Sequence, residues 1–346
     1  MTLGFGIVGY GKMAEIQHRV QIGKVKEARL VAVCDPLPVR RELAKSQGAR
    51  PYEDFDAFLG DADLDVVVVA TPSNSHAEYA VRAAQAGKHV LSEKPMAPDA
   101  AAAERMIDAA RKNKVVLTVY HNRRYDGDVQ AVMKVLRSGK LGRILAIESR
   151  VNSWGSARGF GIKEFHQDWR IESAWGGGAL YDFGPHLFDQ LLLMVDSPVA
   201  SVYADMQQGV HAKDCDDYAC GIIRFANGTM ALAEINFMTH APLPRFNIIG
   251  EKGTLQSEAG RHGALLLHWA DGRRITRVPP VQTPVDQIYH TLVRAIAGKK
   301  GDLAAPPEHC LRVMRLMDAY RASARSGKSV ELKGESATFT KSRRAR

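Results

Sequence analysis

The first 120 residues alternate short apolar runs with amphipathic stretches, and this alternation limits the fold more than any other feature of the sequence. Five runs rich in Val, Ile and Leu predict buried strands at residues 4–9, 30–34, 66–71, 89–92 and 115–120. Helical patterns occupy residues 13–20, 39–47, 54–59, 76–87 and 99–113, the last entered at Asp99 after a proline. Strands that alternate with helices predict a doubly wound parallel sheet with helices on both faces.

The rhythm changes after Tyr120, which predicts a second domain. Helices are expected at 129–138, 178–195, 284–297 and 307–326, and a polar loop at 155–173. Strands are expected at 144–154, 199–207, 217–225, 230–237, 245–250, 253–257, 264–269 and 273–278. Short turns such as 226–228 and 271–272 favour an antiparallel sheet. We therefore divide the chain into domains at 1–120 and 121–335, followed by a basic tail at 336–346 that is expected to be disordered.

Charge and composition exclude several classes of protein. The chain of 346 residues has a formal charge of +9, but residues 1–120 contribute only +1 and the last six residues contribute +4. No zinc-finger or RNA-recognition signature accompanies the basic residues, so we expect no nucleic-acid partner. The longest apolar runs, 66–70 and 191–195, are far shorter than the ~20 residues of a membrane span. Four scattered cysteines predict no disulfide and no metal site, and with no visible secretory signal they favour a cytoplasmic protein.

A glycine-rich turn follows the first predicted strand. Gly9, Gly11 and Ala14 form a GxGxxA pattern between a strand and a helix. Gly9 permits a tight turn, Gly11 lets the backbone approach a pyrophosphate, and Ala14 keeps the helix close to the strand. The second strand ends in Asp35, an acid at the spacing expected for a ligand of the adenosine ribose. The alternative is a chance glycine-rich turn, which this strand–turn–helix context disfavours.

The nicotinamide preference rests on the residues after the second strand. Asp35 would repel a 2′-phosphate, so it favours NAD over NADP. Arg40 and Arg41 complicate this prediction, because either they reach a phosphate or they lie on the solvated face of the second helix. NAD is the predicted cofactor, and NADP stays open.

Two further motifs follow strands of the predicted parallel sheet. The segment 71–76, Thr-Pro-Ser-Asn-Ser-His, leaves the 66–71 strand, and Glu93-Lys94-Pro95 leaves the next strand. Ligands of open parallel sheets bind beyond the carboxyl ends of the strands, so both motifs are expected beside the nicotinamide. Lys94 could hold the substrate oxygen there. A lysine without such neighbours would instead be an ordinary solvated residue.

The second domain carries an Asp–His pair on a predicted helix. Asp182 and His186 are four residues apart and therefore share one helical face, with Asp189 on a neighbouring flank. A carboxylate can orient an imidazole that acts as general base or acid. An isolated pair of this kind is more often structural. Pro185 removes one backbone N–H, so the helix is expected to start late or to bend there.

Taken together, the motifs resemble the glucose–fructose oxidoreductase/inositol dehydrogenase/rhizopine-catabolism (Gfo/Idh/MocA) family. The resemblance rests on GxGxxA, Thr71-Pro72 with His76, Glu93-Lys94-Pro95 and Asp182-x-Gly184-x-His186, in that order and at those spacings, and covers nearly the whole chain. The segment 120–126 is also similar to that family. Residues 165–170 and 176–190 are most similar to scyllo-inositol dehydrogenase-type sugar and polyol oxidoreductases.

The resemblance implies a Rossmann domain for NAD(P) and an α/β domain with an open, mostly antiparallel sheet that binds substrate and forms a homodimer or homotetramer. It implies that Lys94 and His186 handle the proton while Asp182 orients His186, and that the Lys94–Pro95 bond is cis. The implied cofactor residues are Gly9, Tyr10, Gly11, Lys12, Met13, Asp35, Arg40, Thr71, Pro72, Asn74, His76, Glu93 and Lys94. The candidate substrate residues are Arg123, Asn152, Trp154, His166, Asp168, Trp169, Arg170 and Asp189. Trp154 and Trp169 could equally be packing residues, and Arg123 and Arg170 could equally suit an acidic sugar.

The activity implied is hydride transfer between nicotinamide and a secondary alcohol of a sugar, glycoside or cyclic polyol. One alternative is a redox-assisted glycoside-cleaving enzyme that recycles tightly bound NAD without net release of NADH. Another is a non-enzymatic NAD(P) sensor, which would be expected to lack the Lys or the His. A nucleic-acid binder would rest on net charge alone.

Overall fold

The computed structural model describes residues 2–155, 160–258, 263–284, 286–299, 301 and 303–332. The chain divides into two compact units. Unit 1 comprises Met1–His121, Ala157–Gly177 and Val285–Met314, and unit 2 comprises Asn122–Ser156, Gly178–Pro284 and Arg315–Arg346. The chain first passes from unit 1 to unit 2 after His121, and two later segments of the chain belong to unit 1. The predicted tail at 336–346 lies outside the described residues.

Unit 1 contains a parallel sheet, as predicted. Its six described strands are ordered β3-β2-β1-β4-β5-β6, and every neighbouring pair is parallel. The strands are β1 (Leu3–Val8), β2 (Ala28–Cys34), β3 (Arg50–Tyr52), β4 (Val66–Val69), β5 (His89–Ser92) and β6 (Leu117–Val119). The four valines of β4 are fully buried at the centre of the sheet, which explains the uninterrupted apolar run in the sequence.

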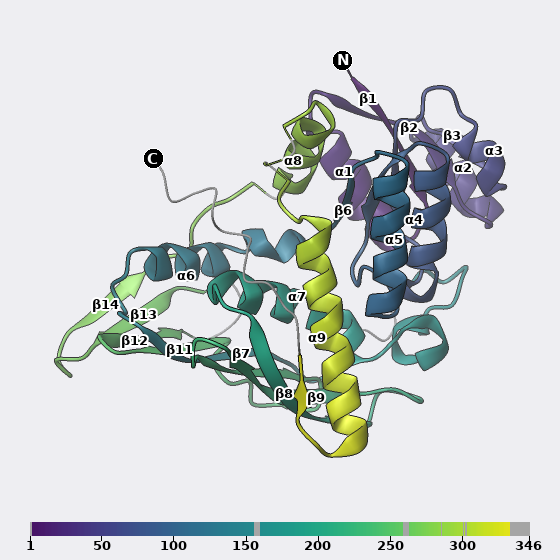
Figure 1. Cartoon of the computed structure of the whole chain (residues 1–346). Helices are drawn as coiled ribbons and strands as arrows, with labels where there is room; N and C mark the ends of the chain where they lie inside the picture. The colour runs from purple at the N-terminus through teal and green to yellow at the C-terminus, as the bar shows by residue number, and fades with distance from the viewer. Residues whose placement is uncertain are drawn as a thin grey trace. The chain divides into compact units, whose positions relative to one another are not determined.

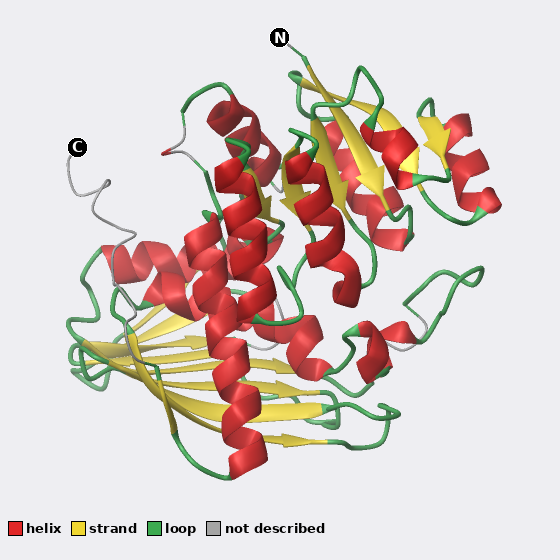
Figure 2. Cartoon of the chain, turned by 45° about the vertical axis from the view of Figure 1, so that its right-hand side comes forward, coloured by secondary structure: helices red, strands yellow, loops and turns green. Residues whose placement is uncertain are grey.

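Helices pack on both faces of this sheet (Figure 2). They are α1 (Arg19–Ile22) with the π-helical turn η1 (Ala14–His18), α2 (Pro38–Ser46), α3 (Phe55–Leu59), α4 (His76–Gln85) after η2 (Ser73–Ser75), α5 (Ala100–Lys112) and α8 (Gln287–Ile296). The Asp99 side chain accepts a hydrogen bond from Ala102 N–H, which confirms the predicted entry of α5. The side chain of Asp54 caps α3 in the same way through Ala57 N–H.

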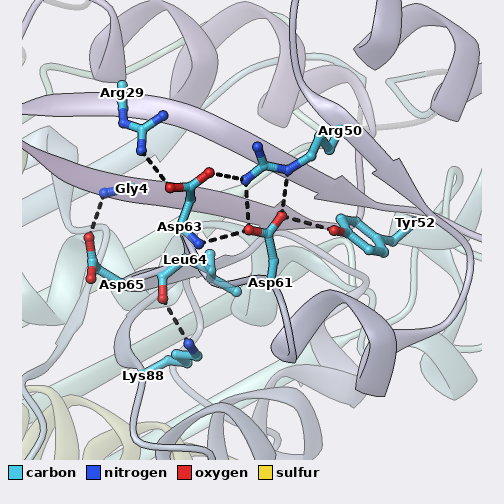
Figure 3. Close-up of polar contacts among 9 residues, drawn as sticks. All are labelled: Gly4, Arg29, Arg50, Tyr52, Asp61, Asp63, Leu64, Asp65 and Lys88. Carbon is cyan, nitrogen blue, oxygen red and sulfur yellow. Dashed lines mark hydrogen bonds and ion pairs between the residues drawn. The ribbon is translucent and has the colours of Figure 1, made fainter.

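A charged cluster lies at the amino ends of these strands (Figure 3). Arg50 binds both oxygens of Asp61 at 2.6 and 2.8 Å and also contacts Asp63 at 2.8 Å. Asp65 accepts a hydrogen bond from Gly4 N–H at 2.8 Å. These contacts attach the connection between α3 and β4 to β1 and β3. They lie at the amino ends of the strands, opposite the carboxyl ends where ligands of such sheets bind.

Unit 2 contains a nine-stranded sheet within the described residues, ordered β14-β13-β12-β11-β7-β10-β9-β8-β15. Only the β7–β10 pair is parallel, so the prediction of a mostly antiparallel sheet is confirmed. The strands are β7 (Ile144–Asn152), β8 (Val199–Gln207), β9 (Tyr218–Phe225), β10 (Met230–Asn236), β11 (Phe246–Gly250), β12 (Gly253–Ser257), β13 (Leu265–Trp269), β14 (Ile275–Val278) and β15 (Val330–Glu331).

Helices α6 (Gly127–Arg137) and α7 (Ala179–Met194) lie on one face of this sheet (Figure 1). The second half of α9 (Pro307–Ser326) packs there too, where Tyr320 donates a hydrogen bond from its hydroxyl to Ala233 O at 3.0 Å. Helix α7 starts at Ala179 and continues through Pro185, so the late start, one of the two predicted alternatives, is wrong. Asp216 explains the early start, because its backbone and side-chain oxygens accept hydrogen bonds from the Ala179 and Leu180 N–H groups, each at 2.7 Å.

Specific contacts explain why later segments belong to unit 1. Thr118 of β6 donates a hydrogen bond from its hydroxyl to Ala305 O at 2.8 Å, and Asn74 donates one from its amide to Ala174 O at 2.9 Å. These partners are 187 and 100 residues apart in sequence, so the change of rhythm near residue 120 could not indicate them. Across the parts of the chain that the structure describes, no helix is long and apolar enough to cross a membrane.

Candidate functional site

The glycine turn at the carboxyl end of β1 has the shape that a dinucleotide requires. Gly9 has φ +83°, and a Cβ there would lie 2.8 Å from Thr71 N, so no other residue fits without strain. A Cβ on Gly11 would meet no atom of the described residues within 4 Å, which leaves space beside the backbone. Ala14 is 1% exposed and holds the helical segment against the sheet. Lys12 and Met13 lie at the start of that segment. These residues fit a pyrophosphate group.

The side chains around the turn are attached to one another. Tyr10 is fully buried, donates its backbone N–H to Asp35 Oδ2 at 2.7 Å, and bonds Gln47 through its hydroxyl. Arg40 Nε donates to Tyr10 O at 2.6 Å, and its guanidinium binds Glu15 at 2.8 Å. Tyr10 therefore supports the turn from the core, and this geometry argues against a direct contact of its side chain with a cofactor.

The two arginines after β2 do not form a solvated helix face, which corrects that alternative. Arg40 is 7% exposed. The side chain of Arg41 donates hydrogen bonds to Asp35 O at 2.9 Å and Pro36 O at 2.7 Å and binds Glu53 at 2.8 Å. Both guanidinium groups thus bind oxygen atoms of the protein. Burial raises the pKa of Asp35, while hydrogen bonds from the Leu37 and Tyr10 N–H groups and the arginine charges oppose that shift.

The loops that follow β4 and β5 are joined by a histidine. His76 is 1% exposed, with Nδ1 at 2.7 Å from Pro95 O and Nε2 at 2.9 Å from Thr71 O. Burial lowers the pKa of His76, against the effect of these two carbonyl groups. Its ring therefore connects the two loops. Pro72 precedes the short 3₁₀ turn η2, and Asn74 is an exposed residue within that turn. The Lys94–Pro95 bond is cis, as the resemblance predicts.

Glu93, the residue that precedes Lys94, is buried. His18 Nε2 lies 2.9 Å from Glu93 Oε1, and Lys94 donates its backbone N–H to Glu93 Oε2 at 3.0 Å. Burial would raise the pKa of Glu93, but the hydrogen bond and charge of His18, together with Lys94, lower it to about 2. Both oxygens are used within the protein, so the geometry argues against Glu93 as a direct cofactor ligand. His18 was not among the residues predicted from the sequence, although it lies four residues after Ala14 in the helical segment that follows the glycine turn.

The segment at 160–177 lies on the cofactor-binding unit. Lys12 Nζ is 4.4 Å from the centre of the Phe160 ring, and the Arg170 guanidinium lies over the rings of Phe160 and Trp169. His166 Nε2 is 2.5 Å from a carboxylate oxygen of Glu172. The predicted substrate residues His166, Asp168, Trp169 and Arg170 therefore belong to unit 1, not to the second domain.

Helix α7 of unit 2 carries the predicted Asp–His pair. Asp182 and His186 are one turn apart, and His186 is 5% exposed. Asp189 is 1% exposed, and Arg124 binds both of its oxygens at 2.7 and 2.5 Å. This bidentate pair argues against Asp189 as a direct substrate ligand. Arg123 lies over the Phe183 ring, 5.2 Å from its centre.

Asn152, at the end of β7, has an unusual environment. Its side-chain oxygen and nitrogen are both buried, and neither has a hydrogen-bond partner among the described residues. Buried amide groups are almost always satisfied, so an additional polar partner is expected here. Nearby in sequence, Trp154 is 49% exposed and stacks on His240 with ring centres 3.9 Å apart.

Comparison with known proteins identifies the class. Residues 3–121 match the model of the oxidoreductase family with an NAD-binding Rossmann fold, and residues 129–256 match the Gfo/Idh/MocA C-terminal domain. The protein is thus an oxidoreductase with an NAD-binding Rossmann domain. It belongs to the Gfo/Idh/MocA family.

Relatives agree with this assignment. The chain is 30% identical to an inositol 2-dehydrogenase of Rhizobium meliloti (81% of this chain, 82% of that one). It is 26% identical to the scyllo-inositol 2-dehydrogenase (NADP(+)) IolW of Bacillus subtilis (96% of each chain). The WlbA dehydrogenase of Bordetella pertussis, crystallised in complex with NADH and UDP-GlcNAcA, superposes with a TM-score of 0.81 at 28% identity (97% of this chain, 100% of that one).

Proposed function

We propose that this protein transfers a hydride between nicotinamide and a secondary alcohol carbon of a sugar, glycoside or cyclic polyol. One observation carries the proposal. This chain of the oxidoreductase family has Lys94 before a cis proline, and it has Asp182 and His186 one turn apart on α7. Two relatives that are named as inositol dehydrogenases support the substrate class.

The proposed mechanism divides the proton chemistry between two residues. His186 takes the hydroxyl proton in the direction of oxidation, and Asp182 orients its imidazole. Lys94 hydrogen-bonds the same oxygen and stabilises the developing alkoxide. The nicotinamide, when bound, supplies the hydride acceptor.

Substrate recognition is proposed to involve the buried amide of Asn152, because a sugar hydroxyl can both donate and accept a hydrogen bond and would satisfy it. The other proposed substrate residues are Arg123, Trp154, His166, Trp169 and Arg170. The two arginines make an acidic sugar a further substrate to test.

We propose NAD as the preferred cofactor. Asp35 places a carboxylate at the end of β2, and Arg40 and Arg41 already bind oxygens of the protein, so neither is poised for a 2′-phosphate. The relative IolW is named for NADP(+), so the preference must be measured. We expect a higher kcat/KM with NAD, and a clear preference for NADP would contradict this part of the proposal.

We also propose a homodimer or homotetramer formed through the sheet of unit 2. Large apolar side chains on its strands are exposed, including Tyr203 of β8 at 52% and Ile275 of β14 at 58%. Light scattering coupled to size-exclusion chromatography should give twice or four times the chain mass, and a monomer would contradict the proposal.

A substrate panel tests the activity. Inositols, neutral sugars, glycosides and uronates are each incubated with NAD or NADP, and reduced cofactor is followed at 340 nm. We expect reduction with at least one member of the panel. Consumption of a sugar with no net change in absorbance would contradict a net dehydrogenase.

Single variants test the catalytic roles. Lys94→Ala and His186→Ala should each lose about two or more orders of magnitude in kcat, because each removes a proton-handling group. NADH affinity, measured by fluorescence titration, should be retained. Full turnover in either variant would refute the role of that residue.

A further inference from the structure

A buried chain of polar groups runs through unit 1 from α8 to the loop after β5. The hydroxyl of Tyr289 is 2.7 Å from His18 Nδ1, and His18 Nε2 is 2.9 Å from Glu93 Oε1. The other oxygen of Glu93 accepts the backbone N–H of Lys94 at 3.0 Å. Tyr289 and His18 are fully buried, and Glu93 is 8% exposed. The chain therefore ends at the peptide of the proposed catalytic lysine.

The middle member comes from an irregular part of the cofactor helix. His18 is the last residue of the π-helical turn Ala14–His18, which begins three residues after Gly11. A π-helical turn adds one residue to a helical turn and is frequent at functional sites. The helical segment that follows the glycine turn thus also supplies the partner of Glu93, which links the cofactor turn to the Lys94 loop.

The hydrogen bonds of this chain are mutually consistent. An ionised Glu93 only accepts, so it takes one N–H from His18 Nε2 and one from the Lys94 backbone. The Nδ1 atom pairs with the Tyr289 hydroxyl in either protonation state of the ring: it accepts the hydroxyl hydrogen when the ring is neutral and donates its own when the ring is charged. A carboxylate in such a site is costly unless its oxygens are satisfied, which explains the need for His18.

A second tyrosine, Tyr120, packs on His18 without a hydrogen bond to it and therefore provides a control for Tyr289. The Tyr120 ring also packs on His18, with ring centres 4.6 Å apart. Its buried hydroxyl has no hydrogen-bond partner among the residues that the structure describes. Tyr120 and Tyr289 therefore form a matched pair, in which only the Tyr289 hydroxyl contacts the polar chain.

We propose that His18, Glu93 and Tyr289 are positioning residues for Lys94: they fix its peptide relative to the cofactor turn and hold a buried negative charge beside its ammonium group. The inference rests on the proposed function only in that it takes Lys94 to be a catalytic residue. The contacts themselves belong to unit 1 alone.

The test uses the full chain and two readouts. The first is competitive acetylation of Lys94 by acetic anhydride at a series of pH values, quantified by mass spectrometry without substrate. The second is kcat as a function of pH with a substrate from the panel. Circular dichroism and NADH affinity check that each variant is folded and binds cofactor.

Glu93→Gln keeps the size of the side chain but removes its charge. Loss of a nearby negative charge favours loss of a proton from an ammonium group, so the midpoint of Lys94 acetylation should fall by about half a pH unit or more. The basic limb of the kcat profile should move the same way, with kcat reduced about 10-fold or more and KM for NAD little changed.

The histidine and tyrosine variants extend the test. His18→Gln can still donate an amide N–H to Glu93, so it should retain more turnover than His18→Ala. Tyr289→Phe should lower kcat about 3- to 10-fold, the equivalent of one hydrogen bond. Tyr120→Phe, which removes a hydroxyl of the same kind that has no partner, should leave kcat and the acetylation midpoint unchanged.

The outcomes separate this inference from the proposed function. An unchanged acetylation midpoint in folded Glu93→Gln would overturn it, as would equal effects of Tyr289→Phe and Tyr120→Phe on kcat. If no panel substrate reacts, the proposed function fails while the acetylation result still decides this inference. If Glu93→Gln does not fold, the comparison of the two tyrosines decides it.

Discussion

Gly9 and Gly11 belong to one turn, but they are glycines for different physical reasons. Gly9 needs a positive φ of +83° and lies against the backbone at residues 70 and 71, so the protein itself excludes a side chain. Gly11 has open space around the position of a Cβ. No described atom of the protein occupies that space, and we propose that the pyrophosphate lies there, so that Gly11 serves cofactor binding and not the folded core.

Gly11→Ala should therefore fold as stably as the natural sequence, or up to about 1 kcal/mol more stably, because alanine reduces the entropy of the unfolded chain. Its affinity for NADH, measured by fluorescence titration, should fall about 10-fold or more, because the methyl group enters the space for the pyrophosphate. Gly9→Ala is the control and should lose about 1–3 kcal/mol of stability even without cofactor. Unchanged NADH affinity in Gly11→Ala would contradict the placement of the pyrophosphate at this turn.

At the scale of elements, the start of α7 depends on a residue 36 positions from Leu180 in sequence. Asp216 accepts hydrogen bonds from the first two N–H groups of the helix that carries Asp182 and His186. Burial raises the pKa of Asp216 to about 6, although its hydrogen bond with Leu180 N–H opposes the shift. The helix is therefore held by a carboxyl group that is costly to ionise.

Asp216→Asn and Asp216→Ala should separate the hydrogen bond from the charge. The alanine variant leaves the Leu180 N–H without its acceptor and should lose about 1–3 kcal/mol. A folded-state pKa above the unfolded value of 3.8 means that the stabilisation is complete below pH 3.8 and lost as the pH rises through 6. Asp216→Asn keeps an acceptor without titrating, so its stability relative to the natural sequence should increase between pH 4 and pH 7. Urea denaturation at several pH values measures this, and a pH-independent difference would contradict the raised pKa.

At the scale of the whole molecule, the stability at acid pH depends on carboxyl groups whose pKa values are shifted in opposite directions. Glu93 and Asp61 have lowered pKa values. His18 opposes the cost of burial at Glu93, and the hydrogen bond from Arg50 lowers the pKa of Asp61. Both residues belong to unit 1, whereas Asp216 with its raised pKa belongs to unit 2. Acid should therefore destabilise the two units unequally.

The free energy of unfolding of Glu93→Gln should approach that of the natural sequence as the pH falls. Because the pKa of Glu93 drops from 4.5 to about 2 in the folded protein, its stabilisation is complete above pH 4.5 and is lost as the pH falls towards 2. The deficit of the variant should be on the order of 3 kcal/mol at pH 6 and should shrink through that window. Denaturant titrations at pH 6, 4 and 3 measure it. A deficit that is constant over this range would show that Glu93 does not stabilise the fold through its charge.

Local pattern was enough to predict most elements. Strands β5, β8 and β12 and helix α9 have the predicted bounds, because each is marked in the sequence by a short apolar run or by a periodic pattern. The three-residue strand β3 was missed because it is too short for a period, and η1 was missed because a π-helical turn has no sequence signal of its own. The motif residues of the cofactor turn could likewise be named from their spacing, whereas the roles of Lys94 and of the Asp–His pair were implied by the family resemblance.

The sequence by itself thus determined the parallel and antiparallel sheets, the family and the candidate chemistry, because periodicity and motif spacing are local properties of the chain. Only the tertiary structure decided what those side chains contact. It paired Asp189 with Arg124, joined Glu93 to His18 and His18 to Tyr289, and assigned residues 160–177 to the cofactor-binding unit. Such partners are tens to hundreds of residues apart, and hydrogen bonds depend on positions in space that no local pattern specifies.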